Sequence, residues 1–102
     1  MGAHFVYAGQ RFRWDMEKAL SNFNKHGIRF EPACEAFFDP FVRVLDASAE
    51  GESREAVVGL AEDWTLLYVV HVVRDHGVIR IISARRATSA ERRIYEDECG
   101  PD

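Results

Sequence analysis

Hydrophobic residues recur at two different periods along this chain of 102 residues, and the change of period separates predicted helices from predicted strands. A spacing of i, i+3, i+4 and i+7 is typical of an amphipathic helix, and Met16, Ala19, Leu20 and Phe23 follow it. Asp15 is a suitable N-cap for this helix, and Gly27 a suitable residue just past its end. The first helix is therefore predicted between these two residues.

Local signals place three further elements around it. The short alternation of residues 12–14 predicts an edge strand before the first helix. Pro32 favours the start of a second helix, which should stop before Asp39 and Pro40 because a residue that precedes proline avoids helical angles. Thr88 and Glu91 have the spacing of a capping box, which predicts a last helix ending near Asp97.

Between the second and last helices the pattern changes to strands, predicted at 41–46, 53–60, 65–74 and 78–84. The stretch 66–73 is apolar at both odd and even positions, as in a central strand that is covered on both sides. Because the connections are short, consecutive strands should pair antiparallel. The chain is thus predicted to be α+β: a short N-terminal strand, two helices, a four-stranded antiparallel meander and a C-terminal helix.

Composition is typical of one globular domain spanning 1–102, with 47% hydrophobic residues. Residues 1–11 are expected to be disordered or to include residues added for expression, and 98–102 to form a tail. Cys34 and Cys99 lack the spacing of a zinc site, so we expect no metal and no cofactor. No apolar run approaches the length of a membrane span, and we expect a cytoplasmic protein without a membrane partner.

Charge is arranged in blocks that the net charge of -4 conceals. Residues 1–30 carry +3 and 74–93 carry +4, whereas 31–63 carry -7 and 94–102 carry -4. If the fold brings the two basic blocks together, they form a cationic surface. Such a surface suits an anionic partner such as a phosphodiester backbone.

The second basic block contains Arg80, Arg85 and Arg86. Strand alternation puts Arg80 and Arg86 on one face and Arg85 on the other, unless a bulge or the strand end turns one of them. Arg80 lies within an apolar strand, so it needs a carboxylate partner or a cleft. Glu52 is a candidate for that partner or for a proton acceptor. A plain solvated surface is the alternative for all of them.

Four other residues are candidates for contact with RNA or for proton transfer. Lys25 and His26 could supply a cation and a titratable base, or merely match the negative end of the helix dipole. The Trp14 ring could stack on an unpaired base. Tyr95 is expected to pack, although its hydroxyl could reach the site. His71 is interpreted as a core histidine and His76 as a turn residue.

An ordered set of motifs in this chain resembles the BrnT family of type II toxins. The motifs are Trp14-Asp15-x-x-Lys18, Lys25-His26-Gly27-Ile28-x-Phe30-Glu31, Phe38-Asp39-Pro40, Glu52-x-Arg54, and Arg80-Ile81-Ile82-Ser83-Ala84-Arg85-Arg86-Ala87-Thr88. The resemblance implies a RelE-like fold and a ribonuclease toxin that inhibits translation and arrests growth. It also implies a BrnA-type ribbon-helix-helix antitoxin, a hetero-oligomer with it, and operator DNA bound only through that antitoxin.

The mechanism expected for such a toxin is metal-independent attack of the RNA 2′-hydroxyl on the adjacent phosphate. Arg80, Arg85 and Arg86 are candidates for stabilising the phosphorane charge, and Arg54 for binding RNA. The base is Glu52, His26 or Lys25, and the acid is open among His26, Tyr95 and an arginine. The rival hypothesis is a binding module whose basic surface docks an acidic partner segment, or RNA that it does not cleave.

Overall fold

The computed structural model describes residues 1–48 and 51–99, and it confirms an α+β fold. The elements in order are β1 (Gly2–Tyr7), β2 (Gln10–Asp15), α1 (Met16–His26), α2 (Phe30–Glu35), a 3₁₀ turn (Ala36–Phe38), β3 (Arg43–Asp46), β4 (Glu55–Leu60), β5 (Leu66–Val73), a second 3₁₀ turn (Asp75–Gly77), β6 (Ile79–Arg86) and α3 (Ser89–Cys99). Part of the predicted turn 47–52 and of the predicted tail 98–102 lies outside the described residues.

The strands form one mixed sheet of six, in the order β1-β2-β6-β5-β4-β3. Strands β3 to β6 pair antiparallel in sequence, as the meander prediction requires. The prediction of an edge strand at 12–14 is wrong, because β2 lies between β1 and β6 and pairs parallel with β6. Disorder over residues 1–11 is also not what the structure shows: β1 runs antiparallel to β2 through six paired positions.

Helix α1 packs along β6 and has a capping residue at each end. The Asp15 carboxylate accepts a hydrogen bond from the Lys18 amide at 3.0 Å, and Gly27 ends the helix at φ 72°. The buried Asn22 amide donates to the carbonyl oxygens of Ile28 and Ala84 and accepts from the Ala84 amide. One side chain therefore fastens the helix to the strand.

Helix α2 begins at Phe30, two residues before the predicted Pro32 start. Proline fits there because the amides of the first helical turn have no partner within the helix. The following 3₁₀ turn stops before Asp39, as predicted.

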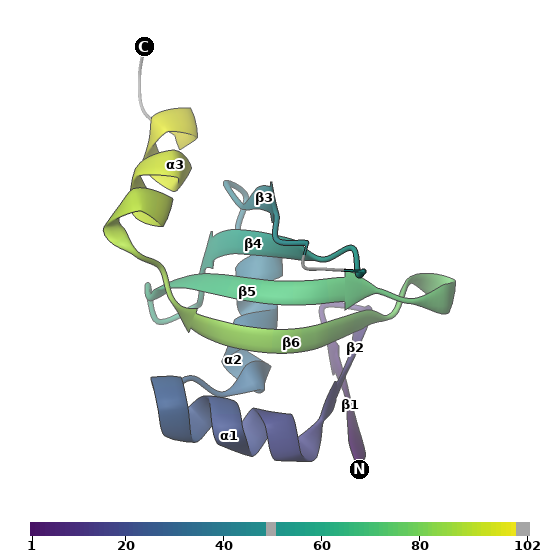
Figure 1. Ribbon diagram of the computed structural model, residues 1–102. Coiled ribbons are helices and arrows are strands. Elements are labelled where there is room, and N and C mark those ends of the chain that lie inside the picture. The colour runs from purple at the N-terminus through teal and green to yellow at the C-terminus, as the bar shows by residue number, and fades with distance from the viewer. Residues whose placement is uncertain (49–50, 100–102) are drawn as a thin grey trace.

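The core lies between the sheet and helices α1 and α2, which both sit on the same side of it (Figure 1). Phe12, Phe30, Leu67 and Ile81 are fully buried there, together with Cys34. The other face of β5 is only half-covered, since Tyr68, Val70 and Val72 keep intermediate exposure. The prediction that this strand is covered on both sides is wrong for that face, and we call it the open face.

Helix α3 leaves the sheet beyond the end of β6 and stands apart from α1 and α2 (Figure 1). The capping box is confirmed: the Glu91 amide donates to Thr88 Oγ1 at 3.2 Å, and the Thr88 amide to Glu91 Oε1 at 2.9 Å. Tyr95 is the residue of α3 that packs into a second cluster, with Val58 and Leu66. No helix in the described residues is long and apolar enough to cross a membrane.

Candidate nucleic-acid interface

A β-bulge in β6 decides which arginines share a face. Val72, Val70 and Tyr68 alternate on the open face of β5, and their partners in β6 are Arg80, Ser83 and Arg85. The register shifts by one residue between these pairs. The bulge therefore reverses the simple alternation: Arg80 and Arg85 lie on the open face, and Arg86 lies on the other.

The parallel pairing of β2 with β6 brings the two basic blocks of the sequence together. Arg13 is the partner of Arg80 in this pairing. Both arginines, with Arg11, Arg74 and His76, line a depression of about 360 Å³, which we call the arginine groove. The expected meeting of the two basic blocks is thus confirmed, and it occurs on the open face.

Glu52 and Arg54 stand beside this groove as an ion pair. Arg54 Nε lies 3.3 Å from Glu52 Oε1, and Arg54 Nη2 lies 3.4 Å from Oε2. The hydrogen bond and charge of Arg54 lower the pKa of Glu52, and the charges of Arg74 and Arg80 lower it further. Glu52 is therefore a carboxylate at neutral pH. Its direct partner is Arg54, whereas Arg80, which the sequence suggested, acts on it only through charge.

His76 belongs to the arginine groove although sequence reasoning set it aside as a turn residue. It lies in the loop between β5 and β6 with φ 63°, a left-handed conformation that is uncommon outside glycine. The Gln10 side-chain amide donates to the carbonyl of neighbouring Gly77 at 2.8 Å, which holds this loop against the start of β2. The groove thereby gains an imidazole side chain.

Arg85 of β6 shares the open face but is bound by Glu91 of α3. Its Nη1 and Nη2 lie 2.8 and 2.9 Å from the two carboxylate oxygens of Glu91, and its guanidinium stacks 4.2 Å above the Tyr68 ring. The hydrogen bond from Arg85 is the main cause that lowers the pKa of Glu91, against the opposing effect of burial. The pair joins β6 to α3, so this arginine presents little free charge.

Three further predicted site residues lie away from the groove. Arg86 borders a separate depression with Phe23 and Gly27, near the C-terminal end of α1. Lys25 and His26 are the last two residues of α1, about 15 Å along the helix from the end that adjoins Arg13. The structure does not bring them beside Glu52.

Two predicted RNA contacts are inside the protein. The Trp14 ring is only 6% exposed and packs against the rings of Phe5 and Phe30, so it offers no free face for a base. The Tyr95 hydroxyl donates to Asp39 Oδ2, which also accepts from the Leu60 amide. Tyr95 thus anchors α3, which confirms the expectation that it packs, and neither Tyr95 nor Trp14 lines the arginine groove.

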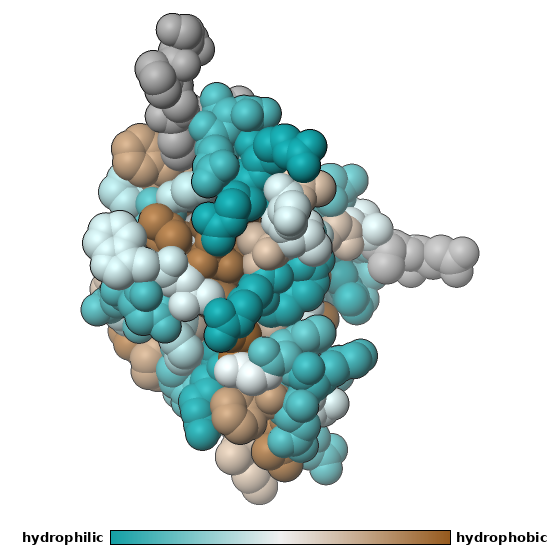
Figure 2. All heavy atoms as spheres, turned by 90° about the vertical axis from the view of Figure 1, so that its left-hand side faces the viewer, coloured by the Kyte–Doolittle hydropathy of each residue, from teal (hydrophilic) through white to brown (hydrophobic). Residues whose placement is uncertain are grey.

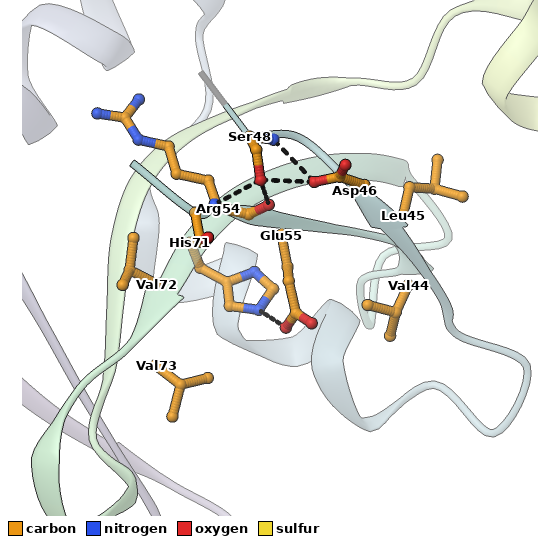
Figure 3. Close-up of a pocket in the computed structure, with 10 residues that line it drawn as sticks. Val44, Leu45, Asp46, Ser48, Arg54, Glu55, His71, Val72 and Val73 are labelled. Atoms are coloured by element: carbon orange, nitrogen blue, oxygen red, sulfur yellow. Dashed lines mark hydrogen bonds and ion pairs between the residues drawn. The ribbon is translucent and has the colours of Figure 1, made fainter. Parts of the chain in front are cut away.

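A larger cavity of about 580 Å³ opens where β3, β4 and β5 end near the loop after β3. Figure 3 shows the His71 imidazole pointing toward the Glu55 carboxylate, with Nε2 3.6 Å from Oε1, while the Arg54 guanidinium points away from them. His71 is a core histidine, as interpreted from the sequence: it is 3% exposed and packs edge-on against Phe37. Its Nδ1 lies 3.3 Å from the Val69 carbonyl oxygen.

Sequence reasoning missed Arg11, Arg13, Arg74 and His76. The alternation Arg11-Phe12-Arg13-Trp14 was a usable signal, because it buries both aromatic rings and turns both arginines to the opposite face. Arg74 and His76 gave no such signal, since their position depends on the strand pairing. Within the described residues, no group of three His, Cys, Asp or Glu side chains is arranged to hold a metal ion.

Comparison with known proteins agrees with the fold and the motifs. The family described as "Ribonuclease toxin, BrnT, of type II toxin-antitoxin system" matches residues 14–91. The crystal structure of the Brucella abortus ribonuclease toxin, BrnT, is similar with a TM-score of 0.55 and 23% sequence identity, covering 74% of this chain and 94% of that chain. At this identity the likeness concerns the fold alone. No curated protein matches the chain in sequence.

Proposed function

Because the chain belongs to the BrnT family of ribonuclease toxins of type II toxin-antitoxin systems, we propose that it is a metal-independent endoribonuclease whose site is the arginine groove. The observation that carries this proposal is the parallel pairing of Arg13 with Arg80, which gathers cations from both basic blocks. A phosphate in the groove meets several guanidinium groups. Positioned cations of this kind stabilise the charge that develops on a phosphorane.

The reaction proposed is attack of the RNA 2′-oxygen on the neighbouring phosphorus. Glu52 accepts the proton of the 2′-hydroxyl, the new oxygen–phosphorus bond forms, and the bond to the 5′-oxygen breaks. His76 donates a proton to that leaving oxygen. The products are a 2′,3′-cyclic phosphate and a free 5′-hydroxyl, so atoms and charges balance without a metal ion.

The assignments of Glu52 and His76 rest on their common neighbours. Arg74 and Arg80 lower the pKa of Glu52, and the same two arginines line the groove with His76. The arginines keep Glu52 ionised but also weaken it as a base, so charge stabilisation by Arg54 and Arg80 carries most of the rate.

The other predicted cations are assigned to RNA further along the strand. Arg86, Lys25 and His26 lie toward the far end of β6, at the end of α1, and we propose that they hold the backbone outside the cleaved bond. Arg85 acts indirectly, because its ion pair with Glu91 joins β6 to α3.

The test is cleavage of a single-stranded RNA by the purified protein in the presence of EDTA. Unchanged cleavage with a cyclic phosphate product is expected for the wild type. Glu52→Gln and His76→Gln should each lower the rate by about 10²- to 10⁴-fold. Glu17→Gln, on the exposed first turn of α1, is the matched control and should retain full activity.

Three outcomes contradict the proposal in different ways. Cleavage that EDTA abolishes in the wild type points to a metal nuclease. RNA that binds tightly to the groove but stays intact points to the rival binding module. Full activity of both Glu52→Gln and His76→Gln leaves a nuclease whose base and acid lie elsewhere.

We propose further that the fold is RelE-like and that cleavage takes place in the cytoplasm, inhibits translation and arrests growth. We also propose that a BrnA-like ribbon-helix-helix antitoxin neutralises the toxin.

The surface along α1 is a candidate for antitoxin binding. Met16, Leu20 and Phe23 are exposed along one side of α1, and Figure 2 shows apolar surface at this lower end of the molecule. An antitoxin that covers this surface and places an acidic segment over the arginine groove would occlude RNA. An antitoxin footprint remote from Arg80 contradicts that part.

A further inference from the structure

The cavity at the ends of β3, β4 and β5 presents two hydrogen-bond acceptors to one another. A carbonyl oxygen can only accept, so the contact of His71 Nδ1 with the Val69 carbonyl places the imidazole proton on Nδ1. Nε2 is then an acceptor, and it faces Glu55 Oε1 at 3.6 Å. Burial lowers the pKa of His71 despite the opposing effects of Val69 and Glu55, which agrees with a neutral ring.

Two facing acceptors favour a donor that bonds to both. The His71 side chain is only 4% exposed, so its Nε2 is available only from the cavity, whereas the Glu55 side chain is 58% exposed at the cavity mouth. Val44 and Val73 flank the pair and give the cavity apolar walls (Figure 3). A flat ring with N–H groups on one edge matches these walls and acceptors.

The cavity shares no lining residue with the arginine groove, but two of its lining residues have direct partners beside that groove. Val72 lines the cavity and is the direct partner of Arg80 in the sheet. Arg54 also lines the cavity, and its guanidinium pairs with Glu52 beside the groove. A nucleotide whose phosphate lies near Arg54 and Arg80 can therefore turn its base toward Glu55 around the strand ends.

We propose that this cavity is a nucleobase subsite that selects guanine, read on its Watson–Crick edge by Glu55 with His71 as the second acceptor. The proposal rests on the proposed function, because the neighbouring groove supplies the RNA. Guanine carries two adjacent donors on that edge, N1–H and the 2-amino group, which match the two oxygens of a carboxylate. Adenine and cytosine place a ring acceptor beside their amino group, and uracil has a single N–H between two carbonyls.

The test measures binding of single-stranded RNA that is 2′-fluoro throughout, which removes the attacking hydroxyl. The oligonucleotides are oligouridines that differ at one central position, which carries guanine, hypoxanthine, adenine or no base. Hypoxanthine lacks only the 2-amino group. The wild type should bind the guanine oligonucleotide roughly tenfold more tightly than the hypoxanthine one. In Glu55→Gln this ratio should fall to about one, because a neutral amide has one acceptor and a competing donor.

Two controls separate base reading from folding and backbone binding. Glu55→Gln should keep the wild-type affinity for the abasic oligonucleotide and the wild-type thermal unfolding midpoint. Glu17→Gln should keep the tenfold ratio. Equal binding of all bases by the wild type, or a guanine preference that persists in Glu55→Gln, overturns the subsite.

The result is independent of whether the chain cleaves RNA. A guanine preference in binding, with unmodified RNA left intact, supports the subsite and contradicts the proposed function. Cleavage without any base preference does the reverse.

Discussion

Arg80 and Arg85 lie five positions apart on one face of one strand, yet their surroundings differ. Arg85 is neutralised by Glu91 in a two-point pair and stacks on Tyr68. Arg80 lies beside Arg13, and the nearby carboxylate of Glu52 is bound to Arg54 instead. An arginine with its own carboxylate holds the structure together, whereas an arginine among other arginines requires an external anion.

The first way to break this comparison is to remove each guanidinium and measure RNA cleavage. Arg80→Ala should lower the rate by about 10²- to 10³-fold, since it removes a positioned cation from the site. Arg85→Ala should lower it by less than about tenfold at a temperature where the variant is folded. Equal losses would show that both arginines act on the phosphate, as the sequence alone suggested.

The second prediction concerns the free energy of unfolding. Here the removal of Arg85 should have the larger effect and the removal of Arg80 the smaller one. Arg85→Ala should lower it by about 1–3 kcal/mol, because the change leaves the half-buried Glu91 without its charged partner. Arg80→Ala should change it by less than about 0.5 kcal/mol. Urea denaturation measures both, and a double-mutant cycle with Glu91→Gln should give a coupling energy for Arg85 alone.

The third prediction uses low pH to weaken the ion pair between Arg85 and Glu91, which has no counterpart at Arg80. The folded protein has a lowered pKa at Glu91, so the stabilising contribution is complete above the unfolded value near 4.5 and is lost as pH falls through the lower folded value. The stability difference between wild type and Glu91→Gln should therefore shrink as the pH falls below about 4.5. A difference that stays constant over this range contradicts the ion pair.

The smallest expected effect concerns the salt dependence of RNA binding. Arg11→Ala and Arg13→Ala should each reduce the slope of log K against log salt concentration by about 0.7, the value for one phosphate contact on a single strand. Arg92→Ala, on exposed α3, should leave the slope unchanged. Titrations at several salt concentrations measure the slope. Equal slopes in all three variants would show that RNA does not bind in the arginine groove.

Sequence patterns predicted the parts of this fold that depend on local interactions. The caps of α1, the capping box of α3 and the antiparallel order of β3 to β6 follow from residues close together in the chain. The parallel contact of β2 with β6 was not predicted, because it joins segments more than sixty residues apart without a local signal. Residues 1–11 were misjudged for a different reason: the segment Gly2–Tyr7 is short and has no clear strand pattern, although it pairs with neighbouring β2 and packs Ala3, Phe5 and Tyr7 against the core.

The candidate site residues also divide into those that have a local signal in the sequence and those that do not. Arg80 and Glu52 were found because a charge inside an apolar strand and a nearby acidic turn are visible in the sequence. The faces of Arg85 and Arg86 were exchanged, since a one-residue bulge leaves no mark in the hydrophobic pattern. Trp14 was assigned to RNA because aromatic residues serve both stacking and packing, and only the structure shows its ring between Phe5 and Phe30.

The pairing of Arg13 with Arg80 also sets the order of events during synthesis of the chain. The arginine groove has one wall near the N-terminus and the other in the last strand to be made. A nascent chain on the ribosome thus carries half a site until β6 has emerged and paired, a contact that forms late because its partners are far apart in sequence. Activity should appear only once β6 has been made and has paired with β2, so a cell that makes this protein is not exposed to active fragments that lack β6.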